Sequence, residues 1–219
     1  LVRSAASVMP KTAQHPVTPF LALWVMLTTV YTVWLMTFWP GVLGEDSVAI
    51  LLEAQNADTF RSGKTIVWYY FVKSLYGSTG RVEVPVGVAL ALCAAMLARI
   101  LAWCWAQRFR KTLWFGLLTI ALAPHMIYVM GTLYPDGLFA VASAALLFEV
   151  WLCVQRRTAS IASLLMLAIA LPFAAFLRPN GLIFLAPVVI ACAWLDTHSR
   201  LRVLLITIAW SATVFAGNQ

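Results

Sequence analysis

Seven apolar stretches, separated by short polar connections, restrict what this chain can form, because a backbone embedded in lipid must satisfy its own hydrogen bonds. Of the 219 residues, 63% are hydrophobic and 11% are charged, whereas soluble domains carry about 25% charged residues. We expect an all-α, polytopic membrane helical bundle of about seven transmembrane helices, formed as a single domain over residues 1–219. The chain begins with Leu rather than Met and stops just after an apolar run, so we also expect a fragment of a longer chain. The expected spans are residues 19–39, 84–106, 112–131, 136–154, 159–177, 181–195 and 203–217.

Lysine and arginine occupy every second connection between these spans, and this alternation predicts the orientation of the chain. Short loops that carry basic residues stay in the cytoplasm. The N-terminus is therefore expected in the cytoplasm, in a bacterial-type inner (plasma) membrane, with residues 40–83, 124–135 and 178–181 on the periplasmic or outer face. The net charge of +7 then reflects topology, and no nucleic acid partner is expected, because no contiguous basic face with interleaved aromatic residues occurs. The basic markers are Arg3 and Lys11, then Arg108, Arg110 and Lys111, then Arg156 and Arg157, then Arg200 and Arg202.

The longest outer connection, residues 40–83, is predicted to form two short surface helices. Asp46 and Ser47 are both good N-cap residue types, so one of them is expected to cap the first helix. The second helix is expected to begin at Thr65 and to stop at Gly77, because glycine commonly ends helices. Its tryptophan and tyrosine side chains favour the headgroup zone of a bilayer, so this helix is expected to lie along the membrane surface.

Acidic residues at the outer ends of two spans are candidates for chemistry. Asp46, beside Glu45, follows a Pro-Gly exit from the first span and opens a helix whose N-terminal dipole favours negative charge. An ionised carboxylate there can act as a general base at neutral pH, although the same residue type also caps surface helices. Asp136, in a Tyr-Pro-Asp-Gly turn, needs water, a cation or a partner at the edge of lipid, or it caps the fourth span. Asp46 and Asp136 together are also a candidate site for Mg²⁺ or Mn²⁺, which prefer carboxylate oxygens.

Glu45 and Asp136 are also candidates for substrate binding, and Arg178, Asn180 and His125 are the remaining ones. Arginine presents a planar fork of donors that grips phosphate oxygens, and a helix that starts at Asn180 and Gly181 adds backbone N–H groups that favour anions. A lipid-linked phosphate or diphosphate fits this arrangement, although a lone arginine at a span end also snorkels to headgroups. His125, late in the third span, could bind substrate or transfer a proton, with a hydrogen-bonded structural histidine as the alternative.

Two charged residues fall inside the predicted spans. Arg99 lies nine residues before Arg108, and Glu149 lies seven residues before Arg156. Each is therefore about 10 to 13 Å from its cytoplasmic basic marker, at a rise of 1.5 Å per residue. Because either charge alone is costly to bury, we predict an intramembrane ion pair between the second and fourth spans.

This layout resembles the GT-C superfamily of membrane glycosyltransferases, in particular the bacterial dolichyl-phosphate-mannose-protein-mannosyltransferase-like enzymes. The resemblance rests on a first span that ends in Pro-Gly and an acidic pair, a long outer loop, an outer Pro-Asp-Gly and an outer Arg-Pro-Asn-Gly. It covers residues 19–194, which would correspond to the N-terminal helical module of such enzymes. The chain departs from the pattern at residues 62–65, where it has Ser-Gly-Lys-Thr and related enzymes often carry a His-Pro or acidic signature.

The resemblance implies an inverting glycosyltransferase that uses a polyprenyl-phosphate sugar at the outer face of the membrane. It implies that Asp46, or Glu45, deprotonates an acceptor as the acceptor attacks the anomeric carbon, while Arg178 faces the departing phosphate. Some superfamily members hold a divalent cation between acids of the first and second outer loops, which would correspond to Asp46 and Asp136. The implied partners are a polyprenyl-phosphate-linked sugar, membrane lipid and an acceptor.

Two other classes of function fit the same sequence. A transporter or flippase for a lipid-linked or anionic substrate also uses ionisable residues in a helical bundle. Such proteins often place these residues near the bilayer midplane and contain related halves, and no second half is visible here. A non-enzymatic membrane assembly subunit requires no chemistry at Asp46 or Arg178, so both residues would be freely replaceable.

Overall fold

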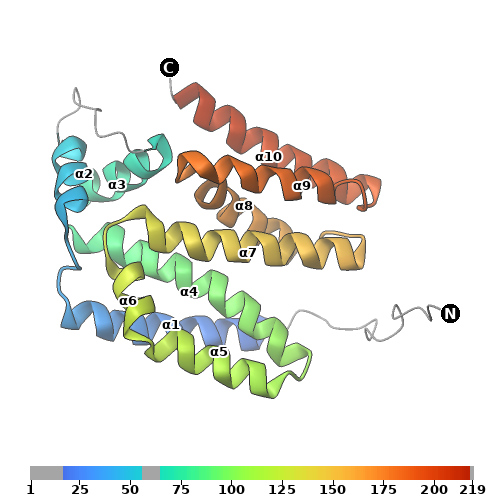
Figure 1. The fold of residues 1–219 in the computed structure, drawn as a ribbon, viewed down its shortest axis with the longest axis horizontal. Helices are drawn as coiled ribbons and strands as arrows, with labels where there is room; N and C mark the ends of the chain where they lie inside the picture. The colour runs from blue at the N-terminus through green and yellow to red at the C-terminus, as the bar shows by residue number, and fades with distance from the viewer. Residues whose placement is uncertain (1–16, 56–64, 218–219) are drawn as a thin grey trace.

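The computed structural model describes residues 17–55 and 65–217, and its regular elements are helices apart from one isolated β-bridge (Figure 1). The predicted all-α class is confirmed. Two basic markers, Arg3 and Lys11, and most of the departing segment 62–65 lie outside the described residues. The elements are α1 (Val17–Thr37), α2 (Glu45–Gln55), α3 (Ile66–Thr79), α4 (Glu83–Ala106), α5 (Arg110–Leu122), α6 (Pro124–Gly131), α7 (Pro135–Arg156), α8 (Ile161–Phe176), the 3-10 helix η1 (Pro179–Phe184), α9 (Leu185–Ala191) and α10 (Thr197–Gly217).

Four of the described helices are long and apolar enough to cross a membrane, and the count is five if the bent pair α5 and α6 forms one span. Helices α1, α4, α7 and α10 contain 21 to 24 residues each. The seven expected spans are not confirmed, because the remaining apolar helices are shorter. Helix α8 has 16 residues, which extend about 24 Å, against a hydrocarbon core of about 30 Å.

The axes of the long helices are roughly aligned, so the connections between helices gather at the two ends of the bundle (Figure 1). The α4–α5, α7–α8 and α9–α10 connections lie at one end, on the right of the view, and carry the described basic clusters. Helices α2 and α3, the α6–α7 connection and the α8–η1 turn lie at the other end. A backbone hydrogen bond of 2.9 Å from the Asp196 N–H to the Arg157 carbonyl ties two of the basic connections together.

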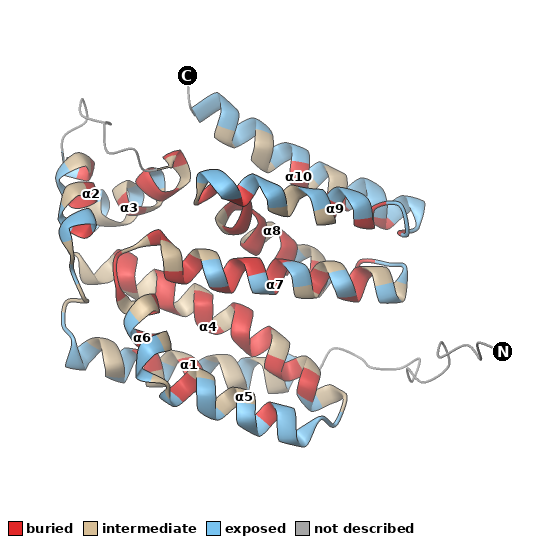
Figure 2. Ribbon diagram, viewed as in Figure 1, coloured by how far each residue is buried: buried red, intermediate tan, exposed pale blue. Residues whose placement is uncertain are grey.

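Helix α4 is at the centre of the bundle, whereas α1 and α10 are at its margin (Figure 2). In the most apolar 18-residue window of α4, 67% of the residues are buried, against 11% in α1 and 6% in α10. The exposed side chains of the two marginal helices include Val25, Val33, Leu205 and Ile208. Exposed apolar surface of this extent suits lipid tails better than water.

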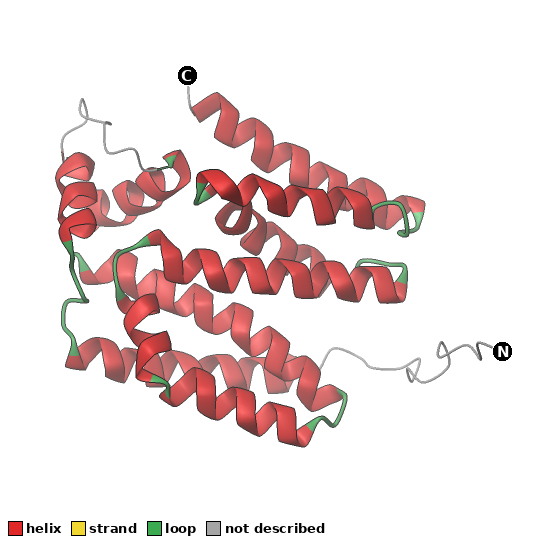
Figure 3. Cartoon of the chain, in the orientation of Figure 1, coloured by secondary structure: helices red, strands yellow, loops and turns green. Residues whose placement is uncertain are grey.

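The third expected span, residues 112–131, is broken into two helices, with a short connection between α5 and α6 (Figure 3). The two helices are inclined by 56°. Pro124 is the first residue of α6. Proline has no N–H, and its ring clashes with the carbonyl one turn earlier, so the preceding helix ends here.

The two helices of the first outer connection also begin and end at positions other than those expected. Helix α2 begins at Glu45, and the Gly44 carbonyl accepts the N–H of Ser47 at 3.0 Å, so Asp46 and Ser47 lie in the first turn and do not precede it. Helix α3 runs through Gly77 and stops at Gly80, whose φ of +66° is the left-handed conformation that glycine adopts readily.

Candidate functional site

The first outer connection pairs directly with the connection between α6 and α7. Val42 forms a parallel β-bridge with Thr132. The Val42 N–H donates to the Gly131 carbonyl at 3.3 Å, and the Val42 carbonyl accepts the Leu133 N–H at 3.4 Å. Two segments about ninety residues apart in the chain are therefore held side by side at the end of the bundle away from the basic clusters.

Ser47 strengthens this attachment at the start of α2. Its side chain is fully buried, donates to the Leu133 carbonyl at 3.3 Å and accepts the Gly44 N–H at 3.3 Å. Asp46 lies one residue before Ser47, and Asp136 lies three residues after Leu133. The acidic starts of α2 and α7 are therefore anchored to the same short connection.

A second attachment brings the α8–η1 turn to this end of the bundle. Thr65, at the N-cap of α3, donates its hydroxyl to the Leu177 carbonyl at 3.0 Å. Leu177 directly precedes Arg178, which is the N-cap of η1. The three outer connections predicted to carry the chemistry therefore meet at one end of the described structure, which we call the outer end.

Arg178 and Asp136 form an ion pair at the outer end, between the α8–η1 turn and the start of α7. Nη2 of Arg178 contacts Oδ1 of Asp136. The side chains are 41% and 46% exposed, respectively. The sequence identified both residues as candidates without indicating that they pair. Water screens an ion pair that is exposed to this degree, so the pair is a weak stabiliser of the fold.

Two glycines fix the backbone next to this ion pair. A Cβ on Gly137 would lie 2.6 Å from the Val129 carbonyl oxygen, and a Cβ on Gly181 would lie 2.6 Å from the Ala174 carbonyl oxygen. Neither position accepts a side chain unless backbone moves. The start of α7 therefore packs tightly against α6, and η1 packs tightly against the end of α8.

Glu45 and Asp46 are exposed in the first turn of α2. The backbone N–H groups of a helix's first turn favour negative charge, so both carboxylates occupy a favourable position along the helix. They lie at the outer end, on the segment anchored to the α6–α7 connection. A carboxylate in this position is accessible to a solvent-borne or headgroup-bound acceptor.

The backbone anion site predicted after Arg178 is not formed as expected. The sixth expected span begins as the 3-10 helix η1 and continues as the short helix α9. The Gly181 N–H donates to the Arg178 carbonyl at 2.9 Å, so it is already used within the turn. The Asn180 side chain is exposed two residues from Arg178, which leaves its amide as the candidate donor.

His125 is set apart from the other candidates. It is exposed at the second residue of α6, at the bend between α5 and α6. The six residues from His125 to the end of α6 at Gly131 extend about 9 Å. None of the hydrogen bonds or ion pairs found among the described residues joins it to Asp136 or Arg178.

The predicted divalent-cation site gains no support from the side chains that surround it. In the described part of the chain, no three His, Cys, Asp or Glu side chains gather where they could hold one ion. Asp136, one of the two predicted ligands, pairs with Arg178, whose positive charge disfavours a cation beside it. Mg²⁺ or Mn²⁺ at Asp46 and Asp136 therefore stays a prediction from the sequence.

An apolar groove of about 680 Å³ lies between α3, α8 and α10, with a smaller contribution from α4. Tyr70, Phe173 and Trp210 are among the side chains that line it. Ile66, another lining residue, directly follows Thr65, whose hydroxyl bonds to the residue before Arg178. One end of the groove, at Ile66, therefore adjoins the Thr65–Leu177 hydrogen bond that holds the turn before Arg178.

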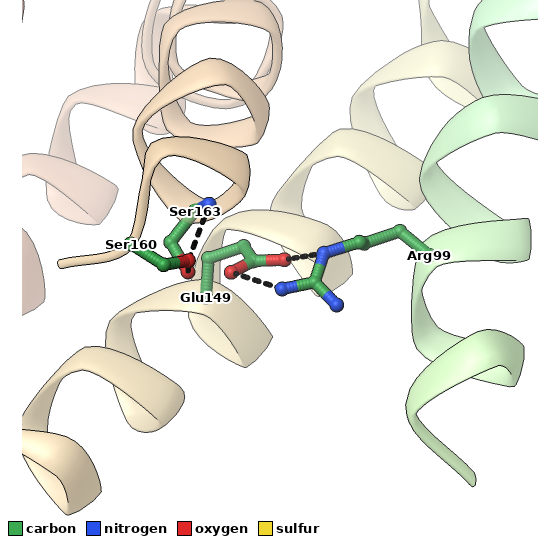
Figure 4. Close-up of polar contacts among 4 residues, drawn as sticks. All are labelled: Arg99, Glu149, Ser160 and Ser163. Carbon is green, nitrogen blue, oxygen red and sulfur yellow. Dashed lines mark hydrogen bonds and ion pairs between the residues drawn. The ribbon is translucent and has the colours of Figure 1, made fainter. Parts of the chain in front are cut away.

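The ion pair predicted inside the bundle is confirmed (Figure 4). Arg99 Nε lies 2.8 Å from Glu149 Oε1, and Nη2 donates to Oε2 at 3.3 Å, so α4 and α7 are joined by a two-point contact. The side chains are 7% and 1% exposed. Ser163 of α8 also interacts electrostatically with the Glu149 carboxylate.

The residues that hold the outer end together were not predicted from the sequence. Ser47 and Thr65 each contact a backbone carbonyl about ninety or more residues away, and Gly44 lies against the Tyr134 hydroxyl so closely that no Cβ fits between them. The only local signal was a hydroxyl residue beside a helix start, which usually indicates a cap. Nothing in the linear sequence pairs these residues with their distant partners.

No family model, curated protein or solved structure matches this chain. The residues at the outer end are therefore the basis for inferring a function. There the chain combines exposed carboxylates on α2, a half-exposed arginine and one end of an apolar groove, at Ile66. This combination suits a ligand with an anionic head and an apolar tail.

Proposed function

We propose that the protein is a glycosyltransferase that moves a sugar from a polyprenyl-phosphate donor to an acceptor at the outer end of the bundle. The observation that carries the proposal is the convergence of three elements: the acidic start of α2, Arg178 and the apolar groove. A polyprenyl-phosphate sugar has an apolar chain, a phosphate and a polar sugar. The resemblance to the GT-C superfamily supports the same interpretation.

The donor is bound at two of these elements. The groove between α3, α8 and α10 accommodates the isoprenoid chain, because its walls are apolar and its volume is within the range of about 300 to 1,000 Å³ typical of ligand sites. Arg178 binds the phosphate through its guanidinium fork, which matches the spacing of phosphate oxygens. The Asn180 amide is a second donor to the same oxygens or to the sugar.

The reaction is a displacement at the anomeric carbon of the sugar. The acceptor oxygen or nitrogen forms a bond to this carbon as the bond from the carbon to the phosphate oxygen breaks, and the configuration inverts. Asp46, or Glu45 beside it, takes the proton of the acceptor. The polyprenyl phosphate leaves with the bonding electrons, and Arg178 stabilises its developing negative charge.

The orientation in the membrane is part of the proposal. The described clusters of two or more basic residues in the connections, Arg108 to Lys111, Arg156 with Arg157, and Arg200 with Arg202, lie at the end opposite the candidate site, whereas Arg81 and Arg178 stand singly at the outer end. Loops that carry basic clusters are retained in the cytoplasm. The site then faces the periplasm or the outside of a bacterial-type inner membrane, with a cytoplasmic N-terminus. Seven crossings follow from this alternation if α5 with α6, α8, and η1 with α9 each complete one crossing.

The proposal is tested by transfer from radiolabelled donors in proteoliposomes that contain the full chain. Polyprenyl-phosphate mannose, glucose and galactose are supplied in turn, and release of labelled sugar from the lipid phase is measured. Asp46→Asn is expected to reduce the rate at least a hundredfold, because a general base contributes about 10² to 10⁴. Glu83→Gln, at the start of α4, is the matched control that removes one acid at the outer end and retains the rate.

A flippase for the same lipid-linked anion is the second candidate function. The lateral groove and Arg178 favour it as well, because they would bind such a lipid whether or not a bond is broken. Movement of an unaltered donor between leaflets, equal in wild type and Asp46→Asn, supports the flippase and contradicts the transferase. If neither transfer nor movement occurs and both Asp46 and Arg178 are freely replaceable, the chain is an assembly subunit.

A further inference from the structure

We infer that Asp136 is a displaceable counter-ion, which occupies Arg178 until the donor phosphate replaces it and thereby keeps ordinary phospholipid headgroups off the site. The inference rests on the proposed function, because it takes Arg178 as the phosphate-binding residue. It assigns Asp136 the role of keeping headgroups off Arg178, in place of metal binding or substrate binding.

The Arg178 side chain has one partner in the described part of the chain, and that partner is Asp136. With both side chains nearly half exposed, the pair is open to an incoming anion. A phosphate offers the guanidinium two oxygens in a bidentate arrangement, whereas the contact with Asp136 uses one nitrogen and one oxygen. An exchange of partners at Arg178 is therefore favourable once a phosphate is in place.

The surroundings of both residues allow this exchange without a change of fold. Gly137 and Gly181 hold the adjacent backbone in close contact with neighbouring helices, so the exchange involves side-chain rotation alone. Asp136 is the second residue of α7, where the backbone N–H groups of the first turn favour a carboxylate. It therefore keeps a favourable electrostatic environment after it leaves Arg178.

An internal counter-ion lowers the affinity of every anion by the same factor. Phospholipids are abundant around the bundle, and an acidic phospholipid carries the same single-charged phosphodiester as the donor. A headgroup that contacts only Arg178 does not overcome this factor, whereas the donor adds the contacts of its isoprenoid chain in the groove. After transfer, the departing phosphate monoester carries up to two charges, and the return of Asp136 to Arg178 assists its release.

The test measures binding of two probes to the full chain in neutral detergent micelles. The first probe is tritiated undecaprenyl phosphate, and the second is phosphatidylglycerol, used as its competitor. The tritiated probe is kept far below its Kd, so that the phosphatidylglycerol concentration that displaces half of it reports the affinity of phosphatidylglycerol itself. Asp136→Asn is expected to lower this concentration up to about fivefold, which corresponds to the removal of an exposed ion pair. Asp136→Ser is a second neutral variant with the same expectation, and Asp136→Glu retains the wild-type value.

Arg178→Ala separates this inference from the proposed function. It is expected to weaken undecaprenyl phosphate binding at least tenfold, whereas Arg81→Ala, an exposed arginine before α4, leaves binding unchanged. If Arg178→Ala has no effect, the proposed phosphate site fails and the inference fails with it. If Arg178→Ala weakens binding but Asp136→Asn and Asp136→Ser leave competition unchanged or weaken it, the phosphate site stands and the counter-ion role is overturned.

Discussion

Helix α7 contributes a carboxylate to two arginine pairs, and the two pairs differ in how far they are buried. Glu149 pairs with Arg99 of α4, with side chains 1% and 7% exposed. Asp136 pairs with Arg178 of the α8–η1 turn, with side chains 46% and 41% exposed. The two arginine–carboxylate pairs therefore differ in what can happen to them, because water or a ligand can replace the carboxylate only where the pair is exposed.

The inner pair is buried away from water. Arg99 donates one hydrogen bond to Oε2 of Glu149 and faces Oε1 at 2.8 Å as an ion contact, so removal of one partner leaves an uncompensated charge inside the bundle. The outer pair is nearly half exposed. It contributes little to stability, and for this reason it can exchange Asp136 for a ligand without loss of the fold.

The largest predicted effect is the loss of stability in Glu149→Ala. Removal of one partner of a buried ion pair is destabilising by about 3 to 5 kcal/mol. Asp136→Ala removes an exposed partner and is destabilising by about 0 to 1 kcal/mol. Thermal unfolding in detergent micelles, followed by circular dichroism, is expected to show a much larger decrease in Tm for Glu149→Ala.

A double variant distinguishes the charge from the volume of the side chain. Arg99→Met combined with Glu149→Leu replaces the inner pair by apolar side chains of similar size, and most of the lost stability should return. Equal decreases in Tm for Glu149→Ala and Asp136→Ala would contradict the contrast between the two pairs.

The next largest effect concerns the backbone that holds the outer pair. Gly181→Ala places a Cβ 2.6 Å from the Ala174 carbonyl oxygen, and overpacking of this kind is destabilising by about 1 to 3 kcal/mol. Gly77→Ala is the matched control, because its Cβ meets nothing within 4 Å. Gly77 lies inside α3, so alanine there should stabilise by about 0.5 to 1 kcal/mol.

The same two variants connect the backbone with the outer site. Gly181→Ala is expected to weaken undecaprenyl phosphate binding, because it displaces the turn that carries Arg178, whereas Gly77→Ala leaves binding unchanged. If Gly181→Ala retained wild-type stability and binding, the turn would accept a Cβ at this position. That outcome would contradict the tight contact with Ala174.

The two pairs also differ in how well the sequence predicts them. The depth of Arg99 and Glu149 could be counted along regular helices from basic markers, because helical rise is constant. Two expected spans, residues 84–106 and 136–154, agree closely with α4 and α7. Where a span is a continuous helix, the pattern of the sequence therefore gave both the element and the partner of its buried charge.

The outer pair lies in turns, where no such count applies. Arg178 is followed by Pro179, and Asp136 lies between Pro135 and Gly137. Proline restricts the backbone and glycine frees it, so the direction that the chain takes through these turns does not follow from the residue types. Their meeting depends on distant contacts such as Ser47 with Leu133. Local patterns likewise did not predict the bend at Pro124 or the 3-10 turn after Arg178. At the outer end, the sequence therefore identified candidate residues without predicting the distances between them.

A smaller effect is predicted for the serine that caps α8 near the inner pair. The Ser160 hydroxyl oxygen accepts the Ser163 N–H at 3.1 Å and lies 3.0 Å from the Ser163 hydroxyl. Loss of an N-cap side chain is destabilising by about 1 kcal/mol, so Ser160→Ala should lower Tm less than Glu149→Ala. Ser160→Asp, which retains a capping oxygen, is the control for the cap itself. A decrease for Ser160→Ala as large as that for Glu149→Ala would mean that the cap and the inner pair act as one unit.

The smallest effect concerns Asp196, a carboxylate held by hydrogen bonds to a serine instead of an arginine. Its Oδ1 accepts the Ser199 N–H at 2.8 Å, and its Oδ2 accepts the Ser199 hydroxyl at 3.0 Å. These bonds lower the pKa of Asp196 from its ordinary value of 3.8. A lowered pKa stabilises the folded state above the ordinary value, and this contribution is lost as the pH falls below 3.8 through the folded-state pKa.

The measurement is the difference in Tm between wild type and Asp196→Asn across a pH series. The wild type should be the more stable at pH 7, and the difference should shrink as the pH falls below about 4, because the protonated wild-type side chain then resembles the amide. The sign follows from the direction of the pKa shift, since the folded state binds its proton less readily than the unfolded state. A difference that stays constant down to pH 3 would show that Asp196 stabilises the α9–α10 turn through shape alone and that its charge contributes nothing.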